Sequence, residues 1–335
     1  MPLNQPLYSL ILFAIVPSFM AKRVLYRPPV ALWDIFDKLQ AVFSDNFDNV
    51  VICKLSRKEF LNVYASVADV VIFTGEYENV MRIKDDLKID ALLIFNGGAL
   101  NPIIVTASAK LDKAIFDIVR ERLFNSGQDC MAPCAILIDR KISNTFIKKL
   151  LVELQKETVG LSYSAKTTIG QMLNASSVAL AAKLLEGYYD KLIFGGIIDP
   201  DVRLISPTVF VFDHVSDLPQ ELMFAPIFLI GVYNSLLEVD DYLSTPIAKK
   251  LKGYISIYTE NKNEWEPKEI FFNNVLINES LFTYESANRE FGGYGLHCSF
   301  ISRFNKISTR PILISKEIAK AFFNSLSKEK RNGCL

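Results

Sequence analysis

Short apolar runs alternate with amphipathic segments along the first hundred residues of the chain. The apolar runs are bounded by turn residues and have the length of buried strands. They lie at 23–26, 50–53, 70–73 and 91–95. The segments between them have apolar residues at helical spacing, and they span 30–43, 57–67 and 78–86. This alternation predicts a parallel sheet covered by helices.

From residue 96 onward the same alternation continues and predicts a second α/β unit. Strands are expected at 103–104, 135–138, 208–212, 227–233, 254–258 and 275–277. Helices are expected at 111–124 and from Ser143, as the capping residue, through Lys156. The last forty residues are expected to contain one strand at 311–314 and a helix at 316–327 before a polar tail.

The apolar segment Leu7–Met20 needs separate consideration because it could be mistaken for a membrane segment. It is shorter than the roughly 18 residues that a spanning helix needs, and Pro17 interrupts it. Lys22 and Arg23 follow the apolar run, whereas a signal peptide has its positive charge before it. We interpret the segment as a buried helix, with a membrane anchor or signal peptide as the alternative.

Composition narrows the class of protein. The chain has 335 residues, of which 50% are hydrophobic, and its 37 acidic and 37 basic residues balance. Such a chain predicts an ordinary globular protein without nucleic-acid or membrane partners. Its five cysteines are odd in number and lack CxxC spacing, which favours free thiols in a reducing cytoplasm. The two histidines argue against a histidine-rich metal site or a Cys–His catalytic pair.

The segment FNSGQDC at 124–130 contains the candidate for chemistry. Cys130 directly follows a Gly-Gln turn at the end of a predicted helix. A cysteine in such a place can be exposed with a lowered thiol pKa, as a nucleophile requires. The alternative is that Cys130 fills a gap in the core, as free cysteines often do.

Seven short segments carry a family resemblance when they are taken in chain order. They are PLNQPL at 2–7, VLYRPP at 24–29, IFTG at 72–75, NGGALNP at 96–102, FNSGQDC at 124–130, FAPI at 224–227, and INES at 277–280 followed by FGGYG at 291–295. In this order they resemble motifs of the aldehyde dehydrogenase superfamily. The resemblance implies an incomplete Rossmann-like dinucleotide-binding domain (1–95), an α/β catalytic domain (96–298) and a C-terminal tail or oligomerisation segment (299–335).

The resemblance also implies a mechanism. Cys130 would attack the aldehyde carbon to give a thiohemiacetal, and hydride transfer to NAD or NADP would leave a thioester. Asn4 and the backbone N–H of Cys130 would stabilise the oxyanion, whose charge develops in the transition state. No metal is implied. The residues that the resemblance assigns to the cofactor are Arg27, Thr74, Gly75, Glu221 and Phe224.

The chain departs from the family pattern at several of these positions. Where hydrolytic members have a glutamate as general base, this chain has Phe95 or Asn96, and neither can accept a proton at neutral pH. Val30 replaces the glutamate that holds the adenosine ribose, and Glu76 stands near the expected pyrophosphate, which it would repel. The position of the ribose-contacting glutamate aligns with Leu222, so Glu221 would have to substitute for it.

These departures leave three functions open. The first is an NAD(P)-dependent aldehyde dehydrogenase that acts through Cys130 on a small aldehyde. The second is an inactive relative that acts as a binding or scaffold subunit. The third is acyl transfer to coenzyme A, or thioester reduction, without a general base. The chain begins at the segment that contains Asn4, where relatives have further strands, so we expect a truncated copy, a homo-oligomer or a partner chain that supplies the missing half.

Overall fold

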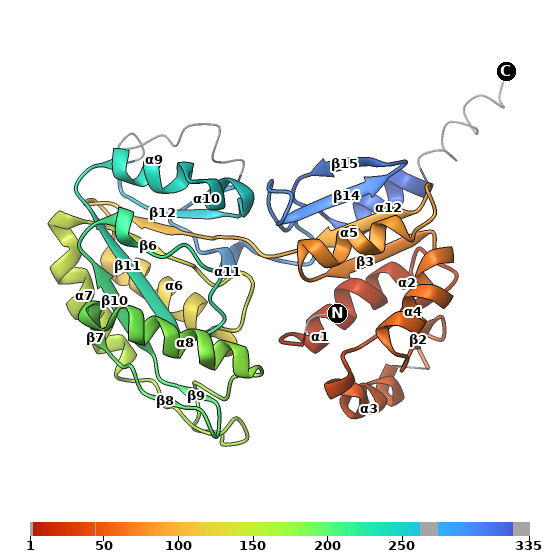
Figure 1. Ribbon diagram of the computed structural model, residues 1–335, viewed down its shortest axis with the longest axis horizontal. Coiled ribbons are helices and arrows are strands. Elements are labelled where there is room, and N and C mark those ends of the chain that lie inside the picture. The colour runs from red at the N-terminus through yellow and green to blue at the C-terminus, as the bar shows by residue number, and fades with distance from the viewer. Residues whose placement is uncertain (1–2, 44, 262–273, 324–335) are drawn as a thin grey trace. The chain divides into compact units, whose positions relative to one another are not determined.

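The computed structural model describes residues 3–43, 45–261 and 274–323 (Figure 1). The chain divides into two compact units. The first comprises Met1–Gly98 with Ser286–Leu335, and the second is Ala99–Glu285. The functional division at 1–95, 96–298 and 299–335 stays a prediction.

The first unit begins with a nearly continuous helical segment. It consists of α1 (Pro6–Leu10), the π-helical η1 (Ile11–Ile15) and α2 (Val16–Ser18). Its apolar residues divide between two core clusters, one that contains Leu10 and Ala14 and one that contains Leu12 and Phe13. The predicted buried helix is therefore confirmed. Within the described residues, no helix is both long and apolar enough to cross a membrane.

Two short parallel strands follow the helical segment. Strand β1 (Val24–Tyr26) pairs with β2 (Val50–Ile52), and between them lie η2 (Val30–Leu32) and α3 (Trp33–Phe43). Phe36 of α3 contacts Tyr26 of β1 with tilted rings at a centroid distance of 5.2 Å, so α3 packs against this pair of strands. After β2 come α4 (Arg57–Val63) and η3 (Ala65–Val67).

A four-stranded sheet with the order β15-β14-β4-β3 completes the first unit. Its elements are β3 (Val70–Thr74), α5 (Tyr77–Asp85), β4 (Leu92–Asn96), β14 (Ser299–Arg303), β15 (Lys306–Thr309) and α12 (Ile314–Phe322). Strands β3 and β4 are parallel, whereas β14 is antiparallel to both β4 and β15. Residues from the end of the chain thus complete a sheet that begins near residue 70.

The strand predicted at 311–314 in this C-terminal region was wrong, because Ile312 makes only an isolated bridge to Phe291. The hairpin formed by β14 and β15 was not expected, because its strands mix apolar, polar and basic residues. The predicted helix begins two residues earlier than expected, at Ile314, and its last positions, 324–327, lie outside the described residues.

The second unit is built on a seven-stranded sheet with the order β13-β12-β5-β6-β11-β10-β7. Its strands are β5 (Ile103–Val105), β6 (Ile136–Asp139), β7 (Leu192–Phe194), β10 (Thr208–Phe212), β11 (Ile227–Tyr233), β12 (Ile255–Tyr258) and β13 (Val275–Ile277). Only β7 runs antiparallel to its neighbour, and the remaining pairs are parallel. A small antiparallel pair, β8 (Ile198–Asp199) and β9 (Leu204–Ile205), lies apart from this sheet.

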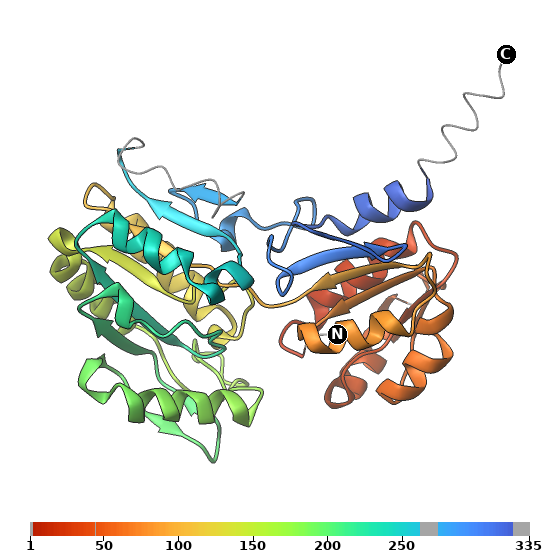
Figure 2. The ribbon, with the colours of Figure 1, turned by 45° about the horizontal axis from the view of Figure 1, so that its top comes forward.

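Helices cover both faces of the large sheet (Figures 1 and 2). The helices are α6 (Leu111–Leu123), α7 (Arg140–Leu154), α8 (Ala175–Gly187), α9 (Leu236–Ser244), α10 (Pro246–Lys250) and α11 (Leu281–Tyr284). On one face, α6 and α7 pack against Ile136 and Ile138 of β6. On the other face, α8 and α9 pack against Leu137. Successive side chains of β6 thus pack against helices on opposite faces of the sheet, as expected for a strand that is buried on both faces.

Helix α7 begins earlier than predicted. Asp139 is its N-cap, with a side chain that accepts a hydrogen bond from the backbone N–H of Lys141 at 2.8 Å. Ser143 lies inside the helix, where its hydroxyl donates to the carbonyl oxygen of Arg140 at 3.0 Å. The predicted Ser143 cap was therefore wrong. The other predicted strands and helices agree with observed elements to within a few residues. Several observed elements were not predicted, namely β7, β8, β9, α8, α9, α10 and α11.

Candidate active site around Cys130

The nucleophile loop, residues 124–130, leaves the end of α6 through an unusual backbone turn. Asn125, Ser126 and Gly127 have positive φ values of 49°, 59° and 76° in succession. Three consecutive residues in the left-handed region are costly and persist only where surrounding contacts hold them. The sequence Asn-Ser-Gly suits this geometry, because Asn and Gly tolerate positive φ better than other residues.

Glycine is required at position 127 both because its φ is positive and because another backbone segment lies very close to its Cα atom. A Cβ atom at this position would lie 2.3 Å from the carbonyl oxygen of Ala225. The nucleophile loop therefore packs directly against the segment 223–226, which contains the predicted cofactor residue Phe224. Two motifs that are a hundred residues apart in the sequence meet here within the second unit.

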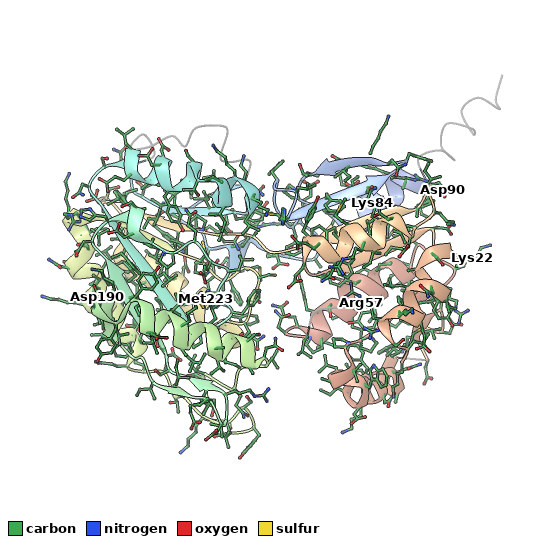
Figure 3. All side chains as sticks on the ribbon, viewed as in Figure 1. Lys22, Arg57, Lys84, Asp90, Asp190 and Met223 are labelled. Carbon is green, nitrogen blue, oxygen red and sulfur yellow. The ribbon has the colours of Figure 1, made fainter. Side chains whose placement is uncertain are left out.

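Arg122 holds these two segments together from the last turn of α6. Its side chain is 1% exposed and donates hydrogen bonds to the carbonyl oxygens of Pro133 at 3.1 Å, Met223 at 2.8 Å and Ala225. Met223 is labelled in Figure 3. Burial lowers the pKa of Arg122 from 12.5 to about 10, so the group remains charged at neutral pH. Hydrogen bonds from a buried cation are among the stronger ones in proteins.

Gln128 and Ser126 connect the loop to a further segment, 170–173. The amide oxygen of Gln128 accepts a hydrogen bond from the backbone N–H of Leu173 at 2.7 Å, and its nitrogen donates to the carbonyl oxygen of Gln171 at 3.3 Å. The Ser126 hydroxyl accepts from the N–H of Gly170 at 2.8 Å. These bonds hold the backbone in its strained conformation just before Cys130.

Asn101 holds the backbone of Cys130 from the other side. Its side-chain nitrogen donates to the Cys130 carbonyl oxygen at 3.0 Å, and its oxygen accepts from the N–H of Tyr254 at 3.0 Å. Asn101 is 4% exposed and follows the Gly-Gly pair of the NGGALNP motif. The motif thus contributes a backbone clamp for the candidate nucleophile.

The Cys130 side chain lies at the edge of an apolar cluster and is half-buried. The residues of this cluster are Met131, Tyr254, Leu276 and Leu281, with Tyr284 packed against them. Burial raises the pKa of the Cys130 thiol well above 9.0, and the negative charges of Asp129 and Glu285 raise it further. The expected lowering of the thiol pKa was therefore wrong, because carboxylates and apolar side chains surround the thiol in place of cations.

Asp129 is itself constrained by the same turn. The carboxyl group is 3% exposed and accepts a hydrogen bond from the backbone N–H of Met131 at 2.8 Å. Burial raises the pKa of Asp129, while its hydrogen bonds to Met131 and to the Cys130 side chain oppose the rise. The Cys130 thiol and the Asp129 carboxyl group therefore form a coupled pair, in which a negative charge on one disfavours a negative charge on the other.

The other predicted residues divide between the two units. Glu221 and Phe224 are half-buried in the second unit, close in sequence to the carbonyls that Arg122 holds. Asn4 and Arg27 lie in the first unit, as do Thr74 and Gly75 at the end of β3.

The carboxyl ends of β3 and β4 contain buried polar atoms that fit a polar ligand. Thr74 and Asn96 are register partners at these ends, and Asn96 is 2% exposed. Among the described residues, neither the Thr74 hydroxyl nor the two side-chain polar atoms of Asn96 have a hydrogen-bond partner. Unsatisfied buried polar groups are costly, so a ligand that supplied the missing bonds would be favoured. Dinucleotides bind at this edge of parallel sheets in many α/β proteins.

The two candidate positions for a general base are occupied by residues that cannot act as one. The Phe95 ring is fully buried among apolar residues of the first unit, in contact with Phe300 at a ring-centroid distance of 4.9 Å. Asn96 contributes a neutral amide. In the described ranges, no group of three or more histidine, cysteine, aspartate or glutamate residues could hold a metal ion.

Sequence reasoning missed Arg122 and Glu121, although a signal for both was present. They occupy the buried stripe of α6 together with Ala114 and Ile118, where an amphipathic helix should be apolar. Adjacent charged residues at helix positions that face the core indicate that their side chains have specific partners there. Asn101 was noticed only as part of a motif, and nothing in the sequence indicated that it contacts Cys130.

Comparisons with known proteins agree with the fold and the motifs. Residues 49–307 match the family model described as the aldehyde dehydrogenase family. A 4,4'-diaponeurosporen-aldehyde dehydrogenase from Staphylococcus aureus is 31% identical over 232 residues, which are 68% of this chain and 50% of that protein. A dimeric NADP-preferring aldehyde dehydrogenase from Canis lupus familiaris is 27% identical over 250 residues, covering 70% of this chain and 53% of that protein.

Solved structures show the same fold. A glyceraldehyde-3-phosphate dehydrogenase from Methanocaldococcus jannaschii complexed with NADP superposes with a TM-score of 0.74 at 22% identity, covering 93% of this chain and 71% of that chain. The chain spans about half the length of the curated relatives that it matches. The predicted resemblance and fold class are confirmed, and the chain belongs to the aldehyde dehydrogenase family.

Proposed function

We propose that the chain oxidises an aldehyde through covalent attack by Cys130. The observation that carries this proposal is a partly accessible cysteine on a strained loop that Asn101, Arg122 and Gln128 hold in place. Such a loop fixes the sulfur atom for reaction, and correct positioning of reacting groups accounts for a large part of enzymatic rate enhancement.

In the proposed reaction, the Cys130 Sγ atom loses its proton to a water molecule and bonds to the aldehyde carbon. The aldehyde oxygen becomes an oxyanion, to which the Cys130 backbone N–H and the Asn4 side chain would donate hydrogen bonds. NAD or NADP, when bound, would accept the hydride from this carbon. The product on Cys130 is a thioester, which an acceptor then cleaves to restore the thiol.

The proposal assigns the cofactor to the residues that the family motifs mark. Arg27 follows β1 and Gly75 follows β3, whose last residue is Thr74, and Glu221 and Phe224 belong to the second unit. The unpartnered polar atoms of Thr74 and Asn96 support this proposal, because the amide and ribose groups of a nicotinamide nucleotide could satisfy them.

The substrate that best suits the surroundings of Cys130 is an uncharged apolar aldehyde. The adjacent cluster is formed by Met131, Leu276, Leu281 and two tyrosines. The carboxylates of Asp129 and Glu285 act on the same thiol and would disfavour an acidic aldehyde. Relatives whose names refer to 4,4'-diaponeurosporen-aldehyde and to beta-apo-4'-carotenal agree with an apolar substrate.

Acyl transfer to coenzyme A is a second candidate that one observation favours. Phe95 is buried and Asn96 is a neutral amide, so no general base stands at the position that hydrolytic relatives use. A thiol acceptor would cleave the thioester without a base that activates water. Addition of coenzyme A to the assay would then accelerate turnover and give an acyl-coenzyme A product.

Oligomeric state and location belong to the same proposal. We propose that the chain assembles as a homo-oligomer or with a partner chain, and the free cysteines of the described residues suit the cytoplasm. Size-exclusion chromatography with light scattering would distinguish these assemblies from a monomer.

The test is to incubate the purified chain with an apolar aldehyde and NADP or NAD, and to measure both NAD(P)H and the mass of the protein. We expect nucleotide reduction and an acyl adduct on Cys130. Both should be lost in Cys130→Ser and kept in Cys134→Ser, which alters a buried cysteine of the same segment. Absence of both signals in the wild-type chain would overturn the proposal in favour of a binding or scaffold subunit.

A further inference from the structure

A pocket in the second unit lies between α9, α10 and the start of β12. It has a volume of about 370 Å³, which includes the part that is open to solvent. Most of its wall is apolar and is formed by Leu100, Pro102, Tyr242, Leu243, Ala248 and Ile255. The described residues of the apolar cluster at Cys130 do not line it. This α9–α10 pocket is therefore separate from the candidate active site, and its size suits a small ligand.

Two lysines give the α9–α10 pocket a positive charge. Lys249 lies in the last turn of α10 and is exposed, and Lys252 is half-buried two residues after the end of that helix. Among the described residues, no acidic side chain lines the pocket, and Lys249 has no ion pair. Burial lowers the pKa of Lys252, and a carboxylate beside it would favour its charged form. An apolar wall beside two cations suits a ligand with an apolar chain and an anionic group.

The wall of the α9–α10 pocket is continuous with the contacts that hold the nucleophile loop. Leu100 and Pro102 are the residues on either side of Asn101, whose side chain holds the carbonyl oxygen of the candidate nucleophile. Gly253, which also lines the pocket, directly precedes Tyr254, whose backbone N–H donates to the Asn101 side chain. A Cβ atom at Gly253 would lie 2.3 Å from the Asn101 Oδ1 atom. A ligand in the pocket would thus contact the neighbours of Asn101 on both chain segments.

We propose that the α9–α10 pocket binds an apolar monocarboxylate and thereby slows reactions at Cys130. The carboxylate would lie beside Lys249 and Lys252, with the chain against the apolar wall. The bound acid would restrict the segments that carry Asn101 and so hold the nucleophile loop in its half-buried position. The inference rests on the proposed function in one respect, since oxidation of an apolar aldehyde with water as acceptor gives an acid of this chemistry.

The ligands of the test separate the charge from the apolar chain. Hexanoate has both, hexanamide keeps the chain without the charge, and acetate keeps the charge without the chain. Ligand-observed NMR titration of the full chain at neutral pH measures the dissociation constant of each. We expect hexanoate to bind with a dissociation constant on the order of 1 mM, and the other two at least about tenfold more weakly.

Substitutions locate the binding. Lys252→Gln removes the half-buried cation of the pocket and should weaken hexanoate binding by about fivefold to tenfold. Lys250→Gln is the matched control, because it removes an exposed cation of α10 that does not line the pocket, and it should leave the affinity unchanged. Ala248→Phe places a ring in the pocket without changing the charge, and it should abolish the binding of hexanoate.

The effect on the nucleophile is measured as the rate at which iodoacetamide alkylates Cys130, by peptide mass spectrometry. Saturating hexanoate should slow this reaction at least about twofold in the wild-type chain, because a ligand that binds the ordered segments reduces the population in which the loop is open. The slowing should persist in Lys250→Gln and be absent in Ala248→Phe. This pair of variants distinguishes binding in the pocket from direct occupation of the space beside the thiol.

The proposal is overturned if hexanoate does not bind saturably, if hexanamide or acetate binds as tightly, or if Lys250→Gln and Lys252→Gln have the same effect. Saturable binding that leaves the alkylation rate unchanged would also overturn it, and so would a slowing that survives in Ala248→Phe, because the acid would then act at the thiol itself. Failure of the proposed oxidation is distinguishable, since a chain that forms no acyl adduct on Cys130 could still bind hexanoate in this pocket.

Discussion

The side-chain amide of Asn101 connects the carbonyl oxygen of Cys130 to the backbone N–H of Tyr254, at 3.0 Å in each case. One residue thus fixes the peptide that follows the candidate nucleophile and ties it to the start of β12. Because Asn101 is 4% exposed, water cannot readily replace either hydrogen bond. The position of Cys130 depends on a residue whose own motif gives no indication of this contact.

Asn101→Ala should destabilise the second unit and loosen the nucleophile loop. The substitution leaves one buried donor and one buried acceptor without a partner, at a cost of about 1–3 kcal/mol in the free energy of unfolding. Urea unfolding measures this change. Asn174→Ala, at the exposed N-cap of α8 where the side chain makes no cap hydrogen bond, is the control and should change stability by less than about 0.5 kcal/mol. Equal effects of the two substitutions would contradict the role given to Asn101.

Asp129→Asn should make Cys130 more reactive toward iodoacetamide at neutral pH. Burial raises the pKa of the thiol well above 9.0, and the charge of Asp129 adds to the rise, so its removal increases the thiolate fraction. We expect a rate increase of roughly threefold to tenfold, since one pKa unit is a factor of ten in thiolate. The asparagine oxygen can still accept the Met131 N–H, so the turn is kept.

Peptide mass spectrometry after timed alkylation measures this rate for each cysteine. In the wild-type chain the rate at Cys130 should rise with pH up to and beyond pH 9.0, because the folded-state pKa lies above that value. Glu186→Gln, which removes an exposed charge from α8, serves as the control and should leave the rate unchanged. A slower reaction of Cys130 in Asp129→Asn would instead indicate that the carboxylate assists deprotonation.

Gly127→Ala should disrupt the nucleophile loop, whereas Gly187→Ala should not. Gly127 has a φ of 76°, and a Cβ there would lie 2.3 Å from the Ala225 carbonyl oxygen. We expect a loss of about 2–4 kcal/mol in the free energy of unfolding, the range for strain at a special backbone position. A Cβ at Gly187, the last residue of α8, would meet nothing within 4 Å, and alanine there should be neutral or stabilise by up to about 1 kcal/mol. Thermal unfolding of both variants distinguishes these outcomes.

Glu121→Gln should increase stability at neutral pH relative to the wild-type chain. Glu121 is 2% exposed, and burial, followed by the charges of Asp117 and Asp129, raises its pKa well above the ordinary value of 4.5. As pH rises through 4.5, the unfolded chain releases this proton while the folded chain retains it. The contribution of Glu121 to stability therefore falls with rising pH until its folded-state pKa is passed.

Glutamine does not titrate, and its oxygen can still accept the hydrogen bond from the Leu281 backbone that Glu121 receives. The stability of Glu121→Gln minus that of the wild type should therefore grow between pH 4.5 and pH 7. Urea unfolding at several pH values in this interval measures the difference. A difference that does not vary with pH would show that Glu121 titrates with an ordinary pKa in the folded chain.

Much of the fold could be predicted because many of the strands, such as β4, β10 and β11, are buried on both faces. Segments such as Thr208–Phe212 and Ile227–Tyr233 are continuous apolar runs, and they coincide with β10 and β11. The hairpin of β14 and β15 could not be predicted in this way, because Lys306–Thr309 is largely exposed and polar and forms a strand only by pairing with β14.

The candidate site was predictable in its residue types but not in its environment. The order of motifs identified Cys130 and Phe224, and the structure brings their segments into contact through Gly127 and Arg122. The pKa of Cys130 was predicted in the wrong direction. A thiol pKa depends on every charge and apolar group around it, and Glu285 reaches this thiol from 155 positions further along the chain.

The sequence by itself determined the family, the alternation of strands and helices, and the identity of the candidate nucleophile, because these depend on local residue patterns and motif order. The tertiary structure alone decided how the nucleophile is held and which charges surround it. Asn101 bonds to Cys130 across 29 positions, Arg122 bonds to Met223 across 101 positions, and Arg27 bonds to Leu55 across 28 positions. Hydrogen bonds and electrostatic interactions act over a few ångströms in space, so contacts between distant segments arise only once the chain has folded.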